Sequence, residues 1–353
     1  MKGLVLCAGF GTRLRPLTYT GAKHLIPVAN RPILFYAIES LVQAGVREIG
    51  LIVGGATRNQ IEEAVGTGAQ FGARVTFLHQ ERPLGLAHAV AIAREFTGDD
   101  RFIVYLGDNI IHGGINDFVE AFPANASAQL LLAKVPDPRR FGVADVQGDR
   151  VVRLVEKPTT AELDMAIVGV YAFTPEVFGA FDRINPSARG ELEITDAIQC
   201  LVEDGKFVRA HGVRSWWADT GRPEDVLDVN RMLLQEIERD IAGDVGPYSK
   251  VVGNVVIGRG TVVRTSVVRG PVIIGADCLI EDCYIGPYTS IADNCELRNT
   301  EIEFSILMPK CTVIDMPVRV DASLIGNQVT LARNEGPART MQFVLGDDSR
   351  IAI

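Results

Sequence analysis

The residues best suited to chemistry lie near the start of the chain, in a glycine-rich turn that two cations accompany. An apolar run, residues 2–6, leads into Gly9-Phe10-Gly11-Thr12-Arg13, and Lys23 follows shortly after. Glycines let the backbone turn tightly and bring its N–H groups against an anion, while Arg13 and Lys23 supply positive charge. The turn therefore predicts a phosphate or polyphosphate site. An ordinary tight turn is the alternative, because a Gly-x-Gly match alone is weakly specific.

The turn fits neither standard nucleotide motif, and other catalytic motifs are missing from the sequence. It lacks the glycine spacing of a dinucleotide fingerprint and the Gly-Lys-Ser/Thr ending of a P-loop. The five histidines show no metal-ligand spacing, and no Gly-x-Ser-x-Gly elbow occurs. Cations, carboxylates and glycines remain, which is typical of phosphoryl or nucleotidyl transfer without a protein nucleophile.

Two aspartates are candidates for holding a metal ion. Asp108 follows the buried apolar run 102–106, and ligands bind at the carboxyl ends of strands in open α/β sheets. Asp219 lies in a short polar break between Trp217 and Gly221. Two carboxylates together with substrate phosphates make a typical Mg²⁺ site. For each aspartate taken singly, capping a turn is an equally good explanation.

A third group of charged residues occurs in the middle of the chain. Glu156-Lys157-Pro158 ends a strand-like run, and Arg189 lies in an acidic stretch that could also begin a helix. In a pocket, Lys157 would meet a phosphate and Glu156 a sugar hydroxyl. A solvated surface ion pair is the alternative.

Composition excludes several other functions. The formal net charge of −9 argues against broad binding of nucleic acid. The first apolar run is too short to span a bilayer and leads to no cleavage site, so no membrane association or secretion is expected. The six cysteines show no Cys-x-x-Cys pair, which favours reduced thiols and a cytoplasmic location.

The chain changes character about two thirds of the way along. Up to about residue 240, apolar runs alternate with amphipathic stretches, which predicts an α/β fold with a Rossmann-like, mostly parallel sheet. The expected strands are 4–6, 49–53, 75–78, 102–106 and 129–135, and the expected helices are 32–44, 60–65, 86–96 and 115–122. A hairpin within 141–175 and a linking helix over 224–240 complete this part.

After about residue 250, aliphatic residues recur roughly every six positions among Gly, Asp, Asn and Cys. Ile257, Ile274 and Ile291 are spaced by one coil of three six-residue faces. This pattern predicts a parallel β-helix, whereas a β-sandwich, the alternative, would alternate with period two. The expected domains are therefore 1–240 and 241–353.

Several ordered blocks then make the chain recognisable. They are the Gly9–Pro16 turn, Lys23 with Leu25-Ile26-Pro27, Gln80 with the 83–89 block, 106–109, 156–158, 189–196 and 217–221. Together they resemble the sugar-1-phosphate nucleotidyltransferases, and within them the long-form thymidylyltransferases that end in a left-handed β-helix. The resemblance covers essentially the whole chain. It implies a Mg²⁺-dependent enzyme that uses a nucleoside triphosphate, dTTP foremost, and a sugar 1-phosphate, glucose 1-phosphate foremost. Because the aliphatic faces of a β-helix suit subunit packing, a homo-oligomer is also expected.

The resemblance also assigns roles, residue by residue. For the triphosphate it implies a cradle and cations that neutralise the leaving end, namely Gly9, Gly11, Thr12, Arg13 and Lys23. For the base it implies Gln80 and Gly85, and for Mg²⁺ it implies Asp108, which also contacts the nucleotide, and Asp219. For the sugar phosphate it implies Lys157, Arg189, Glu156, Gly142, Gly169 and Tyr171.

Three residues differ from those most common in the family, so other substrates remain as alternatives. Ala8, His24 and Phe141 stand where related sequences often have Gly, Gln and Tyr. A guanylyl- or uridylyltransferase acting on another sugar or cyclitol phosphate is one alternative. Acetyl transfer by the β-helix is another, although no histidine follows His211. A non-catalytic sugar-nucleotide sensor is a third.

Overall fold

The computed structural model describes residues 1–333 and 347–352 and divides the chain into two compact units. The first unit comprises Met1–Gly11, Thr20–Leu25 and Ile33–Asp219. The second comprises Thr12–Tyr19, Ile26–Pro32 and the described residues from Thr220 on. Two short N-terminal segments thus belong with the repeat region, and the division at residue 240 stays a prediction about independent domains.

A nine-stranded sheet forms the centre of the first unit, in the order β5-β4-β1-β6-β11-β8-β12-β10-β9. Its strands are β1 (Lys2–Leu6), β4 (Glu48–Val53), β5 (Arg74–His79), β6 (Phe102–Leu106), β8 (Ala128–Lys134), β9 (Gly142–Gln147), β10 (Arg150–Glu156), β11 (Met165–Phe173) and β12 (Val208–Gly212). Strands β5, β4, β1 and β6 run parallel to one another, as predicted. Strand β11 runs antiparallel to β6 and β8, so the sheet is mixed beyond β6.

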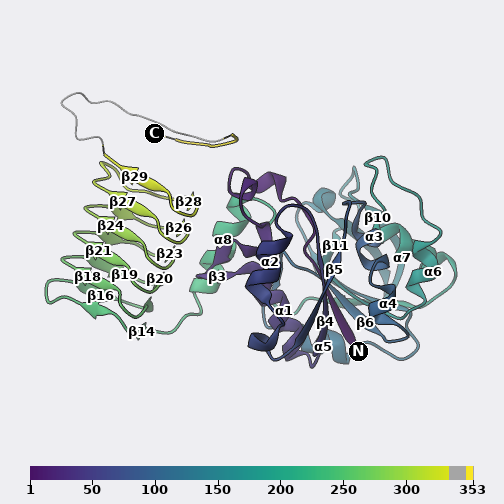
Figure 1. Ribbon diagram of the computed structural model, residues 1–353. Coiled ribbons are helices and arrows are strands. Elements are labelled where there is room, and N and C mark those ends of the chain that lie inside the picture. Colours follow the sequence, from purple (N-terminus) through teal and green to yellow (C-terminus); the bar gives the residue numbers. More distant parts are fainter. Residues whose placement is uncertain (334–346, 353) are drawn as a thin grey trace. The chain divides into compact units, whose positions relative to one another are not determined.

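Helices cover both faces of this sheet (Figure 1). They are α1 (Ile33–Gln43), α2 (Arg58–Val65), α3 (Leu86–Ala91), α4 (Arg94–Thr97), α5 (Asn116–Glu120), α6 (Val177–Phe181) and α7 (Ile194–Glu203). Leu4 and Leu6 of β1 belong to one core cluster, with α3, α6 and α7. Val5 belongs to the other, with α1, α2 and α5. Because side chains alternate along a strand, β1 is apolar on both faces, and it is buried from Gly3 to Leu6, as a Rossmann-like sheet requires.

Three predicted elements differ from the structure. The helix expected over 86–96 is divided into α3 and α4, because Ala93 N–H bonds to Val90 O at 3.0 Å and tightens the turn. The hairpin expected within 141–175 is β9–β10, and its strands join the main sheet. The linking helix is α8 (Pro223–Leu234), and by Asp240 the chain has entered a strand.

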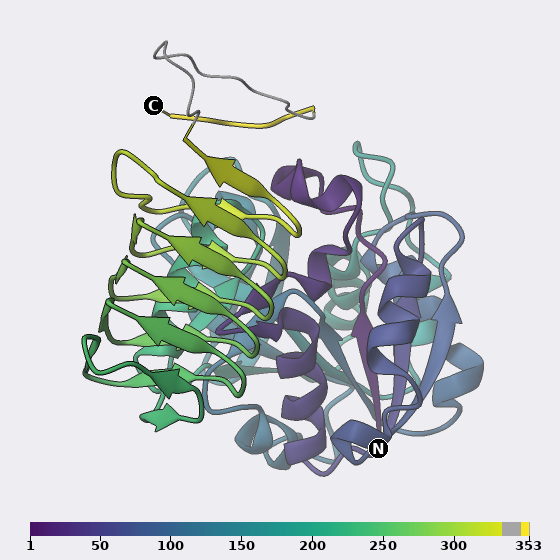
Figure 2. The same ribbon diagram turned by 60° about the vertical axis from the view of Figure 1, so that its left-hand side comes forward.

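The second unit contains a left-handed parallel β-helix, whose coils are stacked as flat rungs (Figure 2). One sheet comprises β14 (Asp240–Ile241), β17 (Val255–Ile257), β20 (Val272–Ile274), β23 (Thr289–Ile291), β26 (Ile306–Leu307) and β28 (Leu324–Ile325). A second comprises β15 (Asp244–Val245), β18 (Val262–Arg264), β21 (Leu279–Glu281), β24 (Glu296–Arg298), β27 (Thr312–Ile314) and β29 (Thr330–Ala332). A third comprises β16 (Lys250–Val252), β19 (Val267–Arg269), β22 (Tyr284–Ile285) and β25 (Glu301–Ile302).

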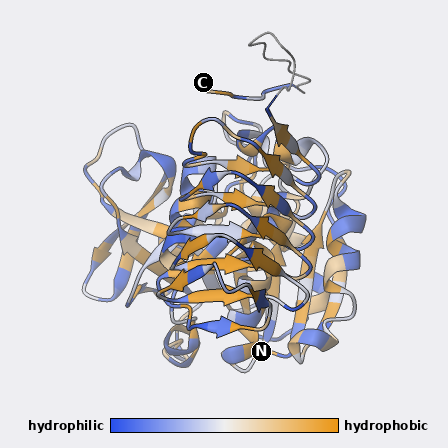
Figure 3. Cartoon of the chain, turned by 90° about the vertical axis from the view of Figure 1, so that its left-hand side faces the viewer, coloured by the Kyte–Doolittle hydropathy of each residue, from blue (hydrophilic) through white to orange (hydrophobic). Residues whose placement is uncertain are grey.

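The predicted repeat spacing is confirmed in register. Ile257 pairs with Ile274, which pairs with Ile291, and all three are buried in one apolar column. The coils alternate apolar strands with polar corners (Figure 3). The all-parallel pairing excludes the β-sandwich alternative.

Helix α8 and the short hairpin β2 (Pro27–Val28) and β3 (Arg31–Pro32) belong to the same unit as the β-helix. Asn230 of α8 is 1% exposed, and its Oδ1 accepts from Ala29 N at 2.8 Å and from Ser290 Oγ at 2.7 Å. Asn30 Nδ2 donates to Ile291 O at 2.6 Å. These hydrogen bonds thus hold a segment from the start of the chain against β23, the fourth strand along its sheet of the β-helix.

Small polar side chains form a ladder at one corner of the β-helix, where Thr261, Cys278, Cys295 and Cys311 occupy equivalent positions. Thr261 Oγ1 donates to Gly275 O at 2.6 Å, and Cys278 Sγ donates to Ala292 O at 3.1 Å. Cys295 Sγ donates to Met308 O at 3.3 Å. Each side chain therefore satisfies a carbonyl in the next coil, and all six cysteines are free thiols.

This ladder predicts that a donor matters more than sulfur. Cys295→Thr should change the free energy of unfolding by less than about 1 kcal/mol, because threonine, as Thr261, already occupies the equivalent position in another coil. Valine has the same shape as threonine but no hydrogen-bond donor. Cys295→Val should therefore lower the free energy of unfolding by about 1–3 kcal/mol, since the Met308 carbonyl loses its partner. Urea unfolding of both variants checks the difference, and equal stability would show that the thiol does not act as a donor.

In the described part of the chain, no helix has the length and apolar character needed to cross a membrane.

Candidate active site

The candidate residues follow the carboxyl ends of neighbouring parallel strands. Cys7 N–H bonds to Ile52 O at 2.8 Å, and Gly107 N–H bonds to Leu6 O at 3.0 Å. Gln80 N–H bonds to Val53 O at 2.9 Å. The segments after β1, β5 and β6 therefore leave the sheet at one edge, where open α/β sheets bind ligands.

The glycine turn is open at this edge. Gly11 has a φ of +62°, which favours glycine, whereas a Cβ added at Gly9 would meet no atom within 4 Å. Phe10 between them is 60% exposed. Thr12 and Arg13 continue the turn as the exposed start of a 3₁₀ turn, Thr12–Leu14, in the second unit. The turn thus leaves space beside Gly9 that the protein itself does not fill.

Lys23 and Asp108 form a largely buried ion pair. Lys23 is 9% exposed, and its Nζ donates to Asp108 Oδ2. Asn109 Nδ2 donates to the other carboxylate oxygen, Oδ1, at 2.8 Å. Burial would raise the pKa of Asp108, but the charge of Lys23 and these hydrogen bonds outweigh it and lower the pKa to about 2. Asp108 is therefore held as a charged carboxylate.

A two-stranded ribbon brings Asp219 beside Asp108. Strand β7 (Asn109–Ile111) pairs with β13 (Trp217–Asp219), and in this antiparallel register Asp219 lies opposite Asn109. Trp217 Nε1 donates to Asn109 Oδ1 at 2.6 Å. The guanidinium of Arg140 lies 3.9 Å from Asp219 Oδ2. Both predicted metal-binding aspartates thus occupy the same end of one ribbon.

The donor set at this end suits Mg²⁺. Two carboxylates leave room for water and phosphate oxygens, which this ion retains as ligands. Among residues 1–333 and 347–352, no group of three or more His, Cys, Asp or Glu side chains forms a closed metal cage. An open site completed by substrate phosphates is therefore the arrangement that these residues fit.

The predicted sugar-phosphate residues Glu156 and Arg189 also meet. Arg189 Nη2 lies 3.1 Å from Glu156 Oε1 and 2.8 Å from Glu193 Oε1. Thr195 Oγ1 donates to Glu156 Oε2 at 3.1 Å. Burial, and then the charge of Glu193, raise the pKa of Glu156. Both carboxylate oxygens of Glu156 already accept hydrogen bonds, Oε1 from Arg189 and Oε2 from Thr195. A sugar hydroxyl that bound Glu156 would therefore have to replace one of these donors.

Lys157 adjoins this cluster in a strained conformation. Its φ is +42°, a left-handed value that a non-glycine residue rarely adopts, and its Nζ lies 3.8 Å from Glu156 Oε1. Such strain costs about 1–3 kcal/mol and is found disproportionately at functional sites. The backbone here directs an exposed cation toward the Glu156 cluster.

Two predicted glycines are required by close contacts. A Cβ at Gly142 would lie 2.7 Å from Thr195 Cγ2 and 3.0 Å from Glu156 Oε2. Gly169 has a φ of +76°, and its Cβ would lie 2.8 Å from Leu106 Cδ1. Tyr171, by contrast, is 4% exposed and stacks on Phe173 within the core. Its place beside a sugar stays a prediction.

Gln80 and Gly85 lie together near a helix start. Gln80 is 5% exposed, and its Nε2 donates to Gly85 O at 3.4 Å. Gly85 has a φ of +107°, and a Cβ there would lie 2.5 Å from Leu192 O. The loop after β5 is therefore packed against the segment that carries Arg189 and Glu193.

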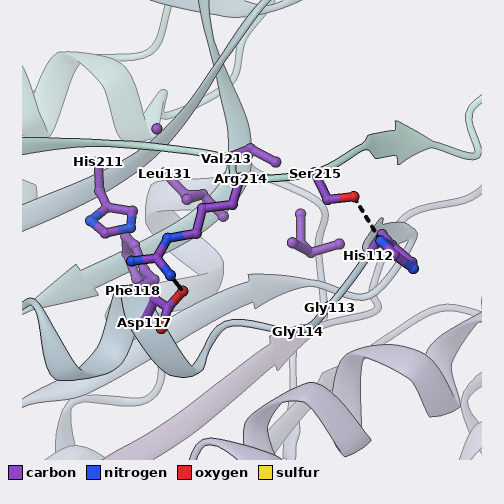
Figure 4. Close-up of a pocket in the computed structure, with 12 residues that line it drawn as sticks. His112, Gly113, Gly114, Asp117, Phe118, Leu131, His211, Val213, Arg214 and Ser215 are labelled. Carbon is purple, nitrogen blue, oxygen red and sulfur yellow. Dashed lines mark hydrogen bonds and ion pairs between the residues drawn. The ribbon is translucent and has the colours of Figure 1, made fainter.

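A pocket of about 280 Å³ lies at the other end of the β7–β13 ribbon (Figure 4). His112 Nδ1 and Ser215 Oγ point toward each other at 2.7 Å, and Arg214 pairs with Asp117. None of the predicted site residues lines this pocket.

Sequence reasoning missed several residues of the site. Asn109 orients Asp108, Trp217 holds Asn109, and Glu193 holds Arg189. All three lie within blocks that the sequence had singled out. Their residue types alone do not indicate a role in the site. Asn109 and Trp217 gain theirs through the pairing of β7 with β13, and Glu193 gains its role from its place at the start of α7.

Comparisons with known proteins agree with this geometry. The family described as Nucleotidyl transferase matches residues 2–236. A glucose-1-phosphate thymidylyltransferase of Streptomyces antibioticus is 48% identical over 100% of this chain and 99% of its own length. A low-salt glycan biosynthesis nucleotidyltransferase of Haloferax volcanii is 45% identical over the full length of both chains.

A solved structure is also similar. That of a glucose-1-phosphate thymidylyltransferase from Bacillus anthracis, in complex with sucrose, has 35% identity and a TM-score of 0.63. The match covers 68% of this chain and 97% of that one. With its Rossmann-like sheet, its paired aspartates and these relatives, the chain belongs to the nucleotidyl transferase family.

Proposed function

We propose that this protein transfers a thymidylyl group from dTTP to glucose 1-phosphate, giving dTDP-glucose and pyrophosphate. One observation carries the proposal: Asp108, paired with Lys23, lies at the same ribbon end as Asp219, at the sheet edge where the glycine turn begins. Relatives named for this activity support the choice of substrates.

The reaction needs no protein nucleophile. An oxygen of the sugar phosphate attacks the α-phosphorus of dTTP, the new P–O bond forms, and the bond to the β-phosphate bridging oxygen breaks. Pyrophosphate leaves with that electron pair. Catalysis of this kind depends on positioning and on neutralising charge. Gly9, Gly11 and Thr12 would cradle the triphosphate, while Arg13 and Lys23 would stabilise the leaving pyrophosphate.

Asp108 and Asp219 would hold Mg²⁺, which when bound neutralises phosphate charge and orients the phosphate oxygens. Lys23 already compensates Asp108, so the carboxylate stays ionised before any ion arrives. Asn109 fixes the carboxylate plane through its hydrogen bond to Oδ1.

The sugar phosphate would bind at the Glu156 cluster. Lys157 and Arg189 would hold its phosphate, and Glu156 would accept from a sugar hydroxyl. Arg189 is shared among carboxylates in the free protein, so binding would draw it from Glu156 toward the phosphate. Glu193 would keep the guanidinium within reach during this exchange.

The proposal is tested by incubating the protein with Mg²⁺, glucose 1-phosphate and each of dTTP, UTP, GTP, dCTP and ATP, and measuring pyrophosphate. We expect release with dTTP to exceed release with the other triphosphates. Selective release with GTP or UTP would replace thymidylyl transfer by one of the alternatives. No release with glucose 1-phosphate or other sugar and cyclitol phosphates would favour a sensor.

Gly9 offers a test of the phosphate cradle. Gly9→Ala should leave the free energy of unfolding unchanged within about 0.5 kcal/mol, because its Cβ meets no atom within 4 Å. If a phosphate occupies that space, the KM for dTTP should rise at least about tenfold. Gly179→Ala, whose Cβ also meets no atom within 4 Å, is the control and should leave KM unchanged. A normal KM for Gly9→Ala would place the triphosphate elsewhere.

The homo-oligomeric state and cytoplasmic location stay predictions. Light scattering coupled to gel filtration would measure the first, with a mass above the 38.3 kDa of one chain expected.

A further inference from the structure

The side-chain amide of Gln80 can adopt only one orientation in this structure. Its nitrogen, Nε2, lies 3.4 Å from Gly85 O and 2.9 Å from His88 Nδ1. A backbone carbonyl can only accept a hydrogen bond, so the amide atom facing Gly85 O is the donor. The NH₂ group therefore points to protein atoms, and Oε1 is the atom left for a ligand.

His88 gives the Gln80 amide a second hydrogen-bond partner in this orientation. Because Gln80 Nε2 has only hydrogens to offer, His88 Nδ1 is the acceptor and carries no proton. Burial, and then the charge of Arg82, lower the pKa of His88, which agrees with a neutral ring at pH 7. A flipped amide would set Oε1 against the Gly85 carbonyl, two acceptors without a hydrogen between them, and would require the other tautomer of His88, with the proton on Nδ1.

Gln80 therefore presents an acceptor. Its two side-chain hydrogen bonds to described residues are both made through Nε2. Thymine and uracil carry an N–H donor at N3, and cytosine carries an acceptor at the same position. The acceptor Gln80 Oε1 can therefore accept a hydrogen bond from N3–H of thymine or uracil, whereas it would face another acceptor at N3 of cytosine.

We infer that His88, on helix α3, is a positioning residue for base specificity: it holds the Gln80 amide so that Oε1 accepts from the N3–H of a thymine or uracil base and rejects cytosine. This inference rests on the proposed function, in which Gln80 reads the base. It adds a residue that does not itself contact the nucleotide and a chemical reason for the choice of pyrimidine.

Two substitutions at position 88 separate the acceptor from the ring. His88→Phe keeps an aromatic ring and removes the acceptor. His88→Asn loses the ring but places a carbonyl oxygen on Cγ, where Nδ1 is attached in histidine. The measured quantity is the ratio of kcat/KM for dTTP to that for dCTP, with glucose 1-phosphate and Mg²⁺. Equilibrium affinities for the two triphosphates, without sugar phosphate, are measured by calorimetry.

We expect His88→Phe to lower the dTTP to dCTP ratio at least about tenfold, since an amide free to rotate can satisfy either base. His88→Asn should keep the ratio within about threefold of the unsubstituted protein. A purely structural role would lower both activities together and leave the ratio unchanged. His88→Leu, which also lacks an acceptor, serves if the phenylalanine variant folds poorly.

An unchanged ratio in His88→Phe, or an equal loss in His88→Asn, would overturn the inference. If the unsubstituted protein transfers thymidylyl groups but the ratio does not respond, only this inference fails. If it transfers none, the proposed function fails, and the calorimetric ratio still decides whether His88 sets the preference for the base.

Discussion

Asp108→Asn should lower kcat about 10²–10³-fold, because it removes one of two carboxylate charges from the proposed Mg²⁺ site without changing side-chain size. The carboxylate is held ionised by Lys23 and oriented by Asn109, so the unsubstituted protein presents a preformed charge to the ion. Pyrophosphate release at saturating substrates measures the effect. The requirement for Mg²⁺ should also shift to higher concentration.

A matched control separates this loss from a general effect of charge. Asp182 is 64% exposed and pairs with Arg94 at the surface, so Asp182→Asn should leave kcat within about twofold. Circular dichroism of both variants checks that the fold is retained. Near-normal turnover of Asp108→Asn with Mg²⁺ still required would contradict the role of this residue.

Lys23→Met should destabilise the protein by about 3–5 kcal/mol, because it leaves the carboxylate of Asp108 in a largely buried place without its cation. Turnover should fall as well, since Lys23 would also neutralise pyrophosphate. The free energy of unfolding, measured in urea, gives the first effect. The surface pair of Lys206 and Glu176, with side chains 43% and 50% exposed, is the control, and Lys206→Met should cost less than about 1 kcal/mol.

The double variant Lys23→Met/Asp108→Asn gives a sharper test of the cause. If the cost comes from an uncompensated buried charge, the double variant should be more stable than Lys23→Met alone. Additive losses from the two substitutions would show that the pair stabilises the fold through packing instead.

The sequence predicted the long, fully buried elements because their patterns are periodic. Strands β1, β4 and β6 contain continuous apolar runs. The number of residues from Ile257 to Ile274, and from Ile274 to Ile291, is the number in one coil of the β-helix. Strands β7 and β13 escaped notice because three residues are too few to show a period. The break at Ala93 also has no glycine or proline to signal it.

The candidate site was predicted in parts and not as a whole. Asp108 and Asp219 are named by their motifs, but only the pairing of Asn109 with Asp219 puts the two residues at one ribbon end. Likewise, nothing in the sequence says that His88 contacts Gln80, because the contact depends on the loop that joins β5 to α3. Long-range geometry supplies the partners that residue type alone cannot.

The central claim is transfer of a thymidylyl group from dTTP to an oxygen of the sugar phosphate, and isotope tracing tests it most directly. Glucose 1-phosphate labelled with ¹⁸O in its phosphate is incubated with the protein, dTTP and Mg²⁺, and the products are analysed by ³¹P NMR. We predict that all the label stays in dTDP-glucose, bonded to the sugar-side phosphorus, with one labelled oxygen bridging to the thymidylyl phosphorus, and that pyrophosphate carries none. Label in pyrophosphate, or the absence of dTDP-glucose, would contradict the mechanism.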